Sequence, residues 1–268
     1  MRVNLIGAGR VGRTILRLCA ATPGFTVGGV ATRNYEGARK ALGSQLVVPT
    51  LSELPPADLW CLAVPDDTIA GVAENLATAG PAPSVAAHFS GYHPASVMAP
   101  LVGWSRASAH PNLSFADPVA AADHFRGTHV ALEGDSEAVS VAETVMRAFG
   151  ATCFRIGATE KPLYHAAAVI ANNFPIVLQG LAREAWAEAG VPDDVARALG
   201  LSLLRSAIAN LERGSPSDVL TGPAARGDST VIEVEAAALG GWRPEAGELY
   251  KVLSRMAVRL KRDGRTGS

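Results

Sequence analysis

The sequence lacks an excess of charge of either sign. Its 268 residues carry 24 Lys and Arg against 25 Asp and Glu, and no block of like charge runs along the chain. A protein whose main partner is nucleic acid or an anionic membrane surface usually concentrates basic residues. The composition argues against both partners, and we expect a small-molecule substrate instead.

Cysteine is scarce and scattered. Cys19, Cys61 and Cys153 are odd in number, far apart and set among apolar residues. This arrangement makes neither a disulfide framework nor a metal-ligand pattern. We expect three small core residues in a reduced, cytoplasmic protein without a metal site.

A long uninterrupted hydrophobic run is also missing. The most apolar long segment, residues 163–182, contains five residues that a membrane helix rarely tolerates together; they are His165, Asn172, Asn173, Pro175 and Gln179. At the N-terminus, glycines interrupt the apolar run that begins after Arg2, so we expect no signal peptide.

What the sequence does have is a glycine fingerprint near its start. The apolar run 2–6 enters G-x-G-x-x-G at Gly7, Gly9 and Gly12, and a helical pattern follows. In a dinucleotide site the first glycine permits the turn, the second lets backbone approach the pyrophosphate, and the third lets helix pack on strand. The helix N-terminus then holds the phosphates. The residues expected there are Gly7, Ala8, Gly9, Arg10, Val11 and Gly12.

The end of the second expected strand favours NADP over NAD. An NAD site usually places Asp or Glu there, about 20 residues after the glycines. This chain has Thr32, Arg33 and Asn34 instead, and no acid before Glu36. A guanidinium with nearby hydroxyl and amide donors suits a 2′-phosphate. The alternative is that Arg33 is a solvated loop charge.

The order of apolar runs predicts an α/β fold, a Rossmann doubly wound parallel sheet followed by an all-α C-terminal domain. We expect strands near 2–6, 26–31, 46–48, 58–64, 84–89, 128–133 and 151–156. Helices are expected near 11–21, 35–42, 67–78 and 136–149, and then near 162–189, 192–200, 201–213, 229–239 and 245–261. The predicted domains are a dinucleotide-binding domain, residues 1–157, and a helical substrate or dimerisation domain, residues 158–268.

Ligands of open α/β sheets bind beyond the carboxyl ends of the strands. This rule selects Val64 and Pro65 as part of the cofactor site, and His88, Ser90 and Gly91 as groups beside the nicotinamide. Ser90 and the Gly91 backbone could donate to a substrate carboxylate or carbonyl. His88 either helps to bind substrate or is a hydrogen-bonded residue at the end of its strand.

Three further clusters carry polar groups. In the first, Pro111 stiffens a turn and positions His110 either as an acid/base or as an ordinary loop residue. In the second, Lys161, His165, Asn172 and Gln179 share one face of an otherwise apolar helix. That face either meets a ligand or forms a polar seam with another helix or a second subunit.

The third cluster lies in the irregular segment 214–228. Thr221 and Arg226 could recognise a substrate, and the Arg226 guanidinium suits an anionic group. Alternatively, Arg226 and Asp228 form a structural pair and cap the helix that begins at Ser229.

Read together, these motifs resemble a known family. The order G-x-G-x-x-G, His-x-Ser-Gly, His-Pro, Leu-Tyr-His-Ala-Ala-Ala with Asn-Asn, and Leu-Thr-Gly-Pro-x-x-Arg-Gly-Asp is similar to Rossmann-like proteins with a DUF2520 C-terminal domain. These resemble pyrroline-5-carboxylate reductases, β-hydroxyacid dehydrogenases and the reductase that couples F420 to NADP. The resemblance implies an NADP-binding domain followed by a helical domain, often dimeric through its helices.

One departure from the β-hydroxyacid dehydrogenase pattern affects the expected acid/base. In that pattern a helix lysine is followed four residues later by asparagine, whereas here Lys161 is followed by His165. We therefore expect His165, not Lys161, to transfer the proton.

These observations predict an NADP-dependent oxidoreductase that moves a hydride between the nicotinamide and a small carbonyl or imine substrate, which carries an anionic group. His165 is the expected acid/base and Asn172 polarises the reacting bond, while Ser90, His110 and Arg226 hold the substrate. Two alternatives stay open: a non-catalytic NADP-binding dimeric module, and an oxidoreductase that uses a second redox cofactor such as F420.

Overall fold

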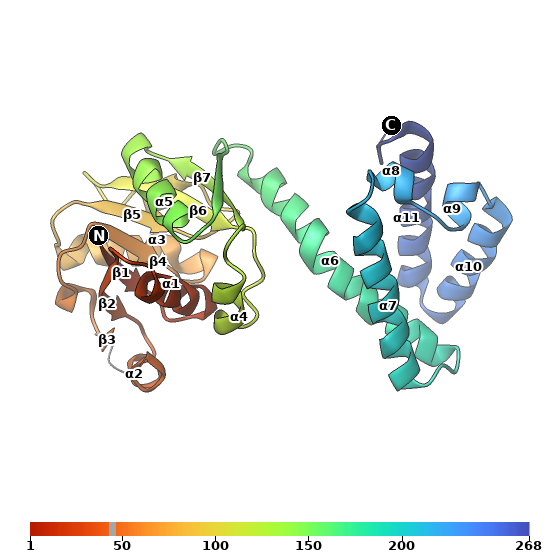
Figure 1. Ribbon diagram of the computed structural model, residues 1–268, viewed down its shortest axis with the longest axis horizontal. Coiled ribbons are helices and arrows are strands. Elements are labelled where there is room, and N and C mark those ends of the chain that lie inside the picture. The colour runs from red at the N-terminus through yellow and green to blue at the C-terminus, as the bar shows by residue number, and fades with distance from the viewer. Residues whose placement is uncertain (43–46, 268) are drawn as a thin grey trace. The chain divides into compact units, whose positions relative to one another are not determined.

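The computed structural model describes residues 1–42 and 47–267. The chain forms two compact units, Met1–Asn172 and Asn173–Ser268. The long helix α6 (Lys161–Glu188) begins in the first unit and ends in the second (Figure 1). The domain boundary expected between residues 157 and 158 stays a prediction, since α6 begins at Lys161 and the compact units divide after Asn172.

The first unit is built on one eight-stranded sheet with the order β3-β2-β1-β4-β5-β6-β7-β8. Neighbouring strands are parallel except for β6 and β7, which are antiparallel. The chain runs outward from β1 in both directions, so the sheet has a topological switch point between β1 and β4. The strands are β1 (Arg2–Ile6), β2 (Thr26–Ala31), β3 (Val47–Val48), β4 (Leu59–Leu62), β5 (Val85–His88), β6 (Ser105–Pro111), β7 (His129–Gly134) and β8 (Thr152–Arg155).

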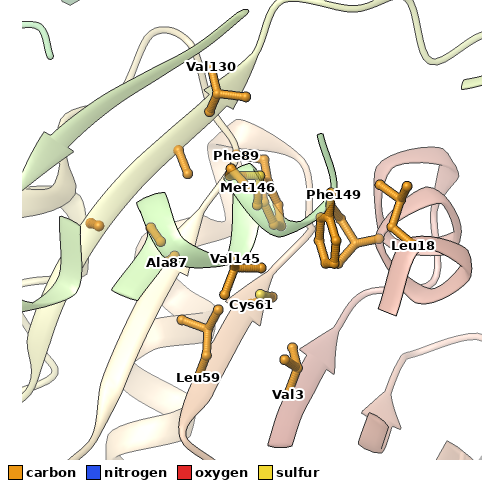
Figure 2. Close-up of a cluster of buried hydrophobic side chains, with 14 of the residues drawn as sticks. Val3, Leu18, Leu59, Cys61, Ala87, Phe89, Val130, Val145, Met146 and Phe149 are labelled. Atoms are coloured by element: carbon orange, nitrogen blue, oxygen red, sulfur yellow. The ribbon is translucent and has the colours of Figure 1, made fainter. Parts of the chain in front are cut away.

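Both faces of the sheet are covered, as the sequence of β4 illustrates. Successive side chains of a strand point to opposite faces. Leu59 and Cys61 accordingly join the core on one face, and Trp60 and Leu62 join the core on the other. All four are apolar because a strand covered on both sides has no polar face. Figure 2 shows the first core, where Val145 of helix 136–148 lies beside the β4 side chains Leu59 and Cys61.

The helices of the first unit divide between these two cores. Helices α1 (Arg10–Ala21) and α5 (Ser136–Ala148) contribute to the first core, and α3 (Ile69–Ala79) and the short turn Ala95–Met98 contribute to the second. Helix α4 (Pro118–Asp123) packs on α1, and α2 (Tyr35–Leu42) packs on β3. Helix α4 begins where it does because Asp117 accepts hydrogen bonds from the amides of Val119 and Ala120.

The second unit contains the end of α6 and five further helices. Gly190, at φ +81°, and Pro192 separate α6 from the next helix, as the sequence predicted. Gly240 and Gly247 let α10 and α11 cross closely, since a Cβ on Gly247 would lie 2.7 Å from the Gly240 Cα. The five helices are α7 (Asp193–Leu211), α8 (Pro216–Val219), α9 (Pro223–Arg226), α10 (Ser229–Trp242) and α11 (Pro244–Asp263).

The structure corrects three expectations about elements. Residues 105–111 form strand β6 between β5 and β7, so His110 and Pro111 lie on a strand and not in a turn. Residues 193–211 form one helix instead of two, because Gly200 is buried inside it. The segment 214–228 is not wholly irregular, since it contains the single-turn helices α8 and α9. The expected start of the third strand, residue 46, lies outside the described residues.

Candidate functional site

A pocket of about 640 Å³ opens at the carboxyl ends of β1, β2 and β4. Its position is that of ligand sites in doubly wound sheets, at the switch point of the strand order. Its lining includes seven of the residues expected to bind a dinucleotide: Gly7, Ala8, Gly9, Thr32, Arg33, Val64 and Pro65.

The three fingerprint glycines have different physical reasons to be glycine. Gly7 has φ +101°, and a Cβ there would collide with the Ala63 carbonyl. A Cβ on Gly12 would collide with the Gly7 carbonyl, so this glycine lets α1 pack against the turn. Gly9 differs, because a Cβ there would meet no protein atom within 4 Å. Two glycines thus serve the packing of the turn, and Gly9 leaves open space in the pocket.

Helix α1 points its N-terminus at this space. Gly9 is the N-cap and has no side chain to occupy the first N–H groups, and no acidic residue lies in the first turn. The amides of Arg10, Val11 and Gly12 are therefore available, since the first N–H groups of a helix have no partner within it. Amides and helix dipole together favour an anion such as a phosphate.

Thr32, Arg33 and Asn34, the residues expected to select NADP, have two different surroundings. Thr32 and Arg33 line the pocket, and the Arg33 side chain is exposed. The Asn34 Oδ1 accepts a hydrogen bond of 3.1 Å from the Gly37 amide. Asn34 therefore holds the first turn of α2 and does not line the pocket.

The pocket is linked by a hydrogen bond to a second group of polar side chains. Asp66 follows the wall residues Val64 and Pro65, and its Oδ2 accepts a bond of 2.7 Å from the Ser90 hydroxyl. Ser90 comes just after β5, so the link runs between the ends of two neighbouring strands.

Ser90 was expected to contact substrate, and its surroundings oppose that role. Its hydroxyl donates to Asp66 and accepts from the amides of Tyr92, at 3.2 Å, and His93, at 3.0 Å. One donor and two lone pairs are all a hydroxyl has. The hydroxyl is fully used within the protein, so Ser90 shapes the loop after β5.

His88 is also fully engaged. Its side chain is completely buried, its Nδ1 accepts from the Ser90 amide at 3.2 Å, and its Nε2 lies 3.2 Å from the Pro94 carbonyl. Because the Pro94 carbonyl can only accept, Nε2 carries the proton. Burial lowers the pKa of His88 to about 3, so the ring is neutral. The geometry favours a structural histidine over a substrate ligand.

Lys161 is buried at the start of α6. Its Nζ donates to the Ser108 hydroxyl at 2.7 Å and to the Ser90 carbonyl at 3.2 Å, which joins α6 to the ends of β5 and β6. Burial lowers the pKa of the ammonium to about 8, and the Glu133 and Asp66 carboxylates oppose that shift. The Lys161 ammonium therefore holds the start of α6 to the ends of β5 and β6.

Two imidazoles meet beside Gly91. The ring centroids of His110, on β6, and His165, on α6, lie 5.6 Å apart with an edge-to-face angle of 81°. A Cβ on Gly91 would lie 2.5 Å from the His165 Cδ2 and 2.8 Å from the His110 Nε2. Gly91 is therefore glycine because both rings crowd it. His110 and His165, predicted as separate clusters, come together.

The other expected site residues lie apart from this pair. Asn172 is exposed, and seven residues of helix separate it from His165, a rise of about 10 Å. Gln179 lies in the second unit, where its amide oxygen faces Gly200 of α7, so this part of the polar stripe is a seam between helices. Thr221 and Arg226 also belong to the second unit, and Arg226 forms an exposed 3.4 Å ion pair with Asp228. Their role toward substrate stays a prediction.

Three residues of the site were given no role from the sequence. The His110 Nδ1 lies 2.8 Å from the Tyr164 hydroxyl, Asn112 donates to the same hydroxyl at 2.6 Å, and Ser108 binds Lys161. Tyr164 could have been found, because positions 161, 164 and 165 share one side of a helix. Ser108 and His110 alternate on β6 and so share one face of the sheet.

Comparison with known families agrees with this architecture. Residues 1–110 match the model of the Rossmann-like domain, and residues 128–257 match that of the domain of unknown function DUF2520. The chain joins a Rossmann-like domain to a DUF2520 domain. The DUF2520 region includes Lys161, Tyr164 and His165, and the Rossmann-like region includes the pocket glycines and His110.

Solved structures share the fold at low identity. A Thermotoga maritima protein is 24% identical, with a TM-score of 0.78, and the match covers 98% of this chain and 99% of that one. A Bacteroides fragilis protein, provisionally named an NADP oxidoreductase, is 22% identical, with a TM-score of 0.75 and coverages of 96% and 98%. Plasmodium falciparum pyrroline carboxylate reductase with NADP bound is 11% identical, with a TM-score of 0.61 and coverages of 96% and 98%. No curated protein matches the chain at a significant level. Within the described ranges, no helix is both long and apolar enough to span a membrane.

Proposed function

We propose that this Rossmann-like, DUF2520-containing chain is an NADP-dependent oxidoreductase that acts on a small carbonyl or imine compound. The observation that carries the proposal is the Asp66–Ser90 hydrogen bond, which links the wall of the pocket to the loop after β5, where Gly91 lies against the His110 and His165 rings. A pocket that fits a cofactor, an acid/base candidate and a hydrogen-bonding imidazole thus lie near one edge of one sheet.

The residues of the pocket fit a nicotinamide dinucleotide. The open space at Gly9 admits a pyrophosphate close to backbone, and the α1 amides suit its charge. Thr32 and Arg33 line the pocket where a 2′-phosphate would be recognised, which favours NADP over NAD. The NADP complex of the structurally similar Plasmodium falciparum reductase supports this choice of cofactor.

The chain's own residues supply positioning and a proton. When bound, the cofactor supplies a hydride equivalent to an electrophilic carbon, and the oxygen or nitrogen of the reacting bond must take up a proton. His165, half-buried beside Gly91, is the proposed acid/base. Burial and the nearby His165 and Lys161 lower the pKa of His110 to about 4, so His110 is a neutral hydrogen-bond partner for the reacting bond. His110 thereby takes the polarising role that the sequence analysis gave to Asn172.

We also propose that a second copy of the chain covers the helical unit. Val195, Leu199 and Leu203 follow one another at four-residue steps on α7, and each side chain is exposed. Val234 on α10 and Val252 on α11 are exposed as well. So much exposed apolar surface on one small unit indicates an interface. A two-fold pairing of like helices buries it with no further partner.

The test combines cofactor binding with turnover. We expect purified protein to bind NADPH and to oxidise it with at least one member of a panel of small carbonyl and imine compounds. His165→Gln should keep NADPH affinity and lower turnover by about 100-fold or more, as expected for loss of an acid/base. His124→Gln removes an exposed histidine and is the matched control.

Two outcomes would replace the proposal. If the protein binds NADPH tightly but oxidises it with none of the carbonyl or imine compounds, this outcome indicates a non-catalytic NADP-binding module. Oxidation that occurs only when a deazaflavin such as F420 is added indicates a second redox cofactor.

A further inference from the structure

We propose that Asn112 and Tyr164 are positioning residues that fix His110 in one tautomer, with its proton on Nε2 beside Gly91. The chain of hydrogen bonds runs from Asn112, at the surface, through Tyr164 on α6 to His110 on β6. One set of directions along this chain leaves every hydrogen with an acceptor, and that set gives a single protonation pattern.

The first step fixes the orientation of the Asn112 amide. Its Nδ2 lies 3.1 Å from the backbone carbonyl of His129, which can only accept a hydrogen bond. The nitrogen and not the oxygen must therefore face His129. The same Nδ2 has a second hydrogen, which it donates to the Tyr164 hydroxyl at 2.6 Å.

The second step fixes the Tyr164 proton. Because the hydroxyl oxygen accepts from Asn112, its own hydrogen is free to point elsewhere. The His110 Nδ1 lies 2.8 Å away and is the one acceptor that the described residues offer to this hydrogen. In the reverse direction, an Nδ1–H would donate to the second lone pair of the hydroxyl and leave the Tyr164 hydrogen without an acceptor. The Tyr164 ring is held between Phe154 and His110, with centroid distances of 6.0 Å and 5.6 Å, so the hydroxyl is aimed by packing as well.

The third step follows from the charge of His110. The side chains that act electrostatically on its ring are His165 and Lys161 from α6, and Tyr164 from α6 bonds to it. Burial and these neighbours keep the ring neutral near pH 7. A neutral imidazole whose Nδ1 accepts must carry its hydrogen on Nε2. That nitrogen is the one that would touch a Cβ at Gly91.

The fixed tautomer narrows the substrate class. An Nε2–H that cannot become an acceptor recognises an acceptor atom, such as the oxygen of a carbonyl or the lone pair of an imine nitrogen. It favours the oxidised form of the substrate over an ammonium product, which offers only donors. This conclusion about the substrate rests on the proposed function, whereas the assignment of the His110 tautomer does not.

The experiment reads the tautomer directly by NMR of protein labelled with ¹⁵N in histidine, without cofactor or substrate. The His110→Gln variant assigns the His110 signals. In the unmodified protein we expect His110 Nδ1 to show the shift of an unprotonated nitrogen and Nε2 that of a protonated one.

Two variants break the chain in different ways. Tyr164→Phe keeps the packing and removes the donor to Nδ1. Asn112→Asp replaces the amide donor by a carboxylate acceptor, which draws the Tyr164 proton away from His110. Both should move the two ¹⁵N shifts of His110 toward those of a tautomer mixture. Tyr92→Phe is the matched control, because it removes a hydroxyl from an exposed ring next to Gly91, and it should leave both shifts in place.

An Nδ1–H tautomer in the unmodified protein, or unchanged His110 shifts in both variants, would overturn the inference. Because the spectra need no activity, an inactive protein with the expected shifts refutes only the proposed function. Conversely, an active reductase with a mobile His110 tautomer refutes only the inference.

Discussion

The Ser90 hydroxyl donates a 2.7 Å hydrogen bond to the Asp66 carboxylate and so joins the end of β5 to the wall of the pocket beyond β4. The backbone carbonyl of Ser90 also accepts from Lys161. One residue therefore touches both the segment that lines the pocket and the helix that carries His165. This arrangement ties the cofactor side of the site to its proton-transfer side.

The fingerprint glycines give a matched pair of substitutions. Gly12→Ala forces a Cβ against the Gly7 carbonyl, so it should destabilise the protein by about 1–3 kcal/mol, the usual cost of an overpacked site. Gly9→Ala meets no protein atom and should leave the unfolding midpoint nearly unchanged. It should nevertheless weaken NADPH binding, because the added methyl group occupies the space for the pyrophosphate. Thermal unfolding and NADPH titration measure the two effects, and equal effects of both substitutions on binding and stability would refute the assignment.

The fingerprint was readable from the sequence because every part of it is local. A strand, three glycines at fixed spacing and a helix follow one another within a few turns of chain, so their geometry hardly depends on the remainder of the fold. The same holds for the helix stop at Gly190. Only the structure shows that Gly12 is required for packing whereas Gly9 leaves open space, because the two glycines look alike in the sequence.

Strand β6 and the burial of Lys161 depend on contacts between distant residues. Residues 105–111 are mostly small and polar, with no β-branched side chain, and they form a strand because β5 and β7 pair with them on both sides. Lys161 was predicted as one member of a polar stripe on its helix, facing a ligand or another helix, yet its hydrogen-bond partners Ser90 and Ser108 lie 71 and 53 residues away along the chain. Sequence periodicity carries no information about such partners.

The neutral His110 predicts a loss of stability in mild acid. Its pKa is about 4 in the folded protein and near 6.5 in the unfolded chain, so between these values the unfolded state binds the extra proton. The free energy of unfolding therefore falls as the pH decreases from 6.5 toward 4. The contribution is on the order of 3 kcal/mol at most, since one pKa unit corresponds to about 1.4 kcal/mol.

Urea unfolding of the unmodified protein and of His110→Gln across this pH range isolates the contribution. The variant should lose less stability in acid, although His88, with a pKa lowered to about 3, keeps a contribution of its own in both proteins. Parallel pH profiles for the two proteins would show that His110 is not held neutral by its surroundings.

The exposed apolar side chains of α7, α10 and α11 predict a dimer, and a single charged substitution on α7 should dissociate it. Leu203→Glu places a carboxylate on the exposed apolar side of α7, where burial against a second copy would cost several kcal/mol. We expect the unmodified protein to sediment as a dimer and this variant as a monomer. Val102→Glu changes an even more exposed apolar residue in the first unit and should leave the dimer intact. A monomeric unmodified protein would contradict the proposal.

The central claim, that this pocket holds NADP, is tested most directly by the ratio of NADPH to NADH affinity before and after Arg33→Glu. We expect the unmodified protein to prefer NADPH. The variant should lose about 10- to 100-fold of that preference, the size of a charge-assisted contact to phosphate. Arg17→Glu makes the same charge change at an exposed position of α1 and should keep the ratio. Equal affinity of the unmodified protein for NADPH and NADH, or an unchanged ratio in Arg33→Glu, would contradict the account.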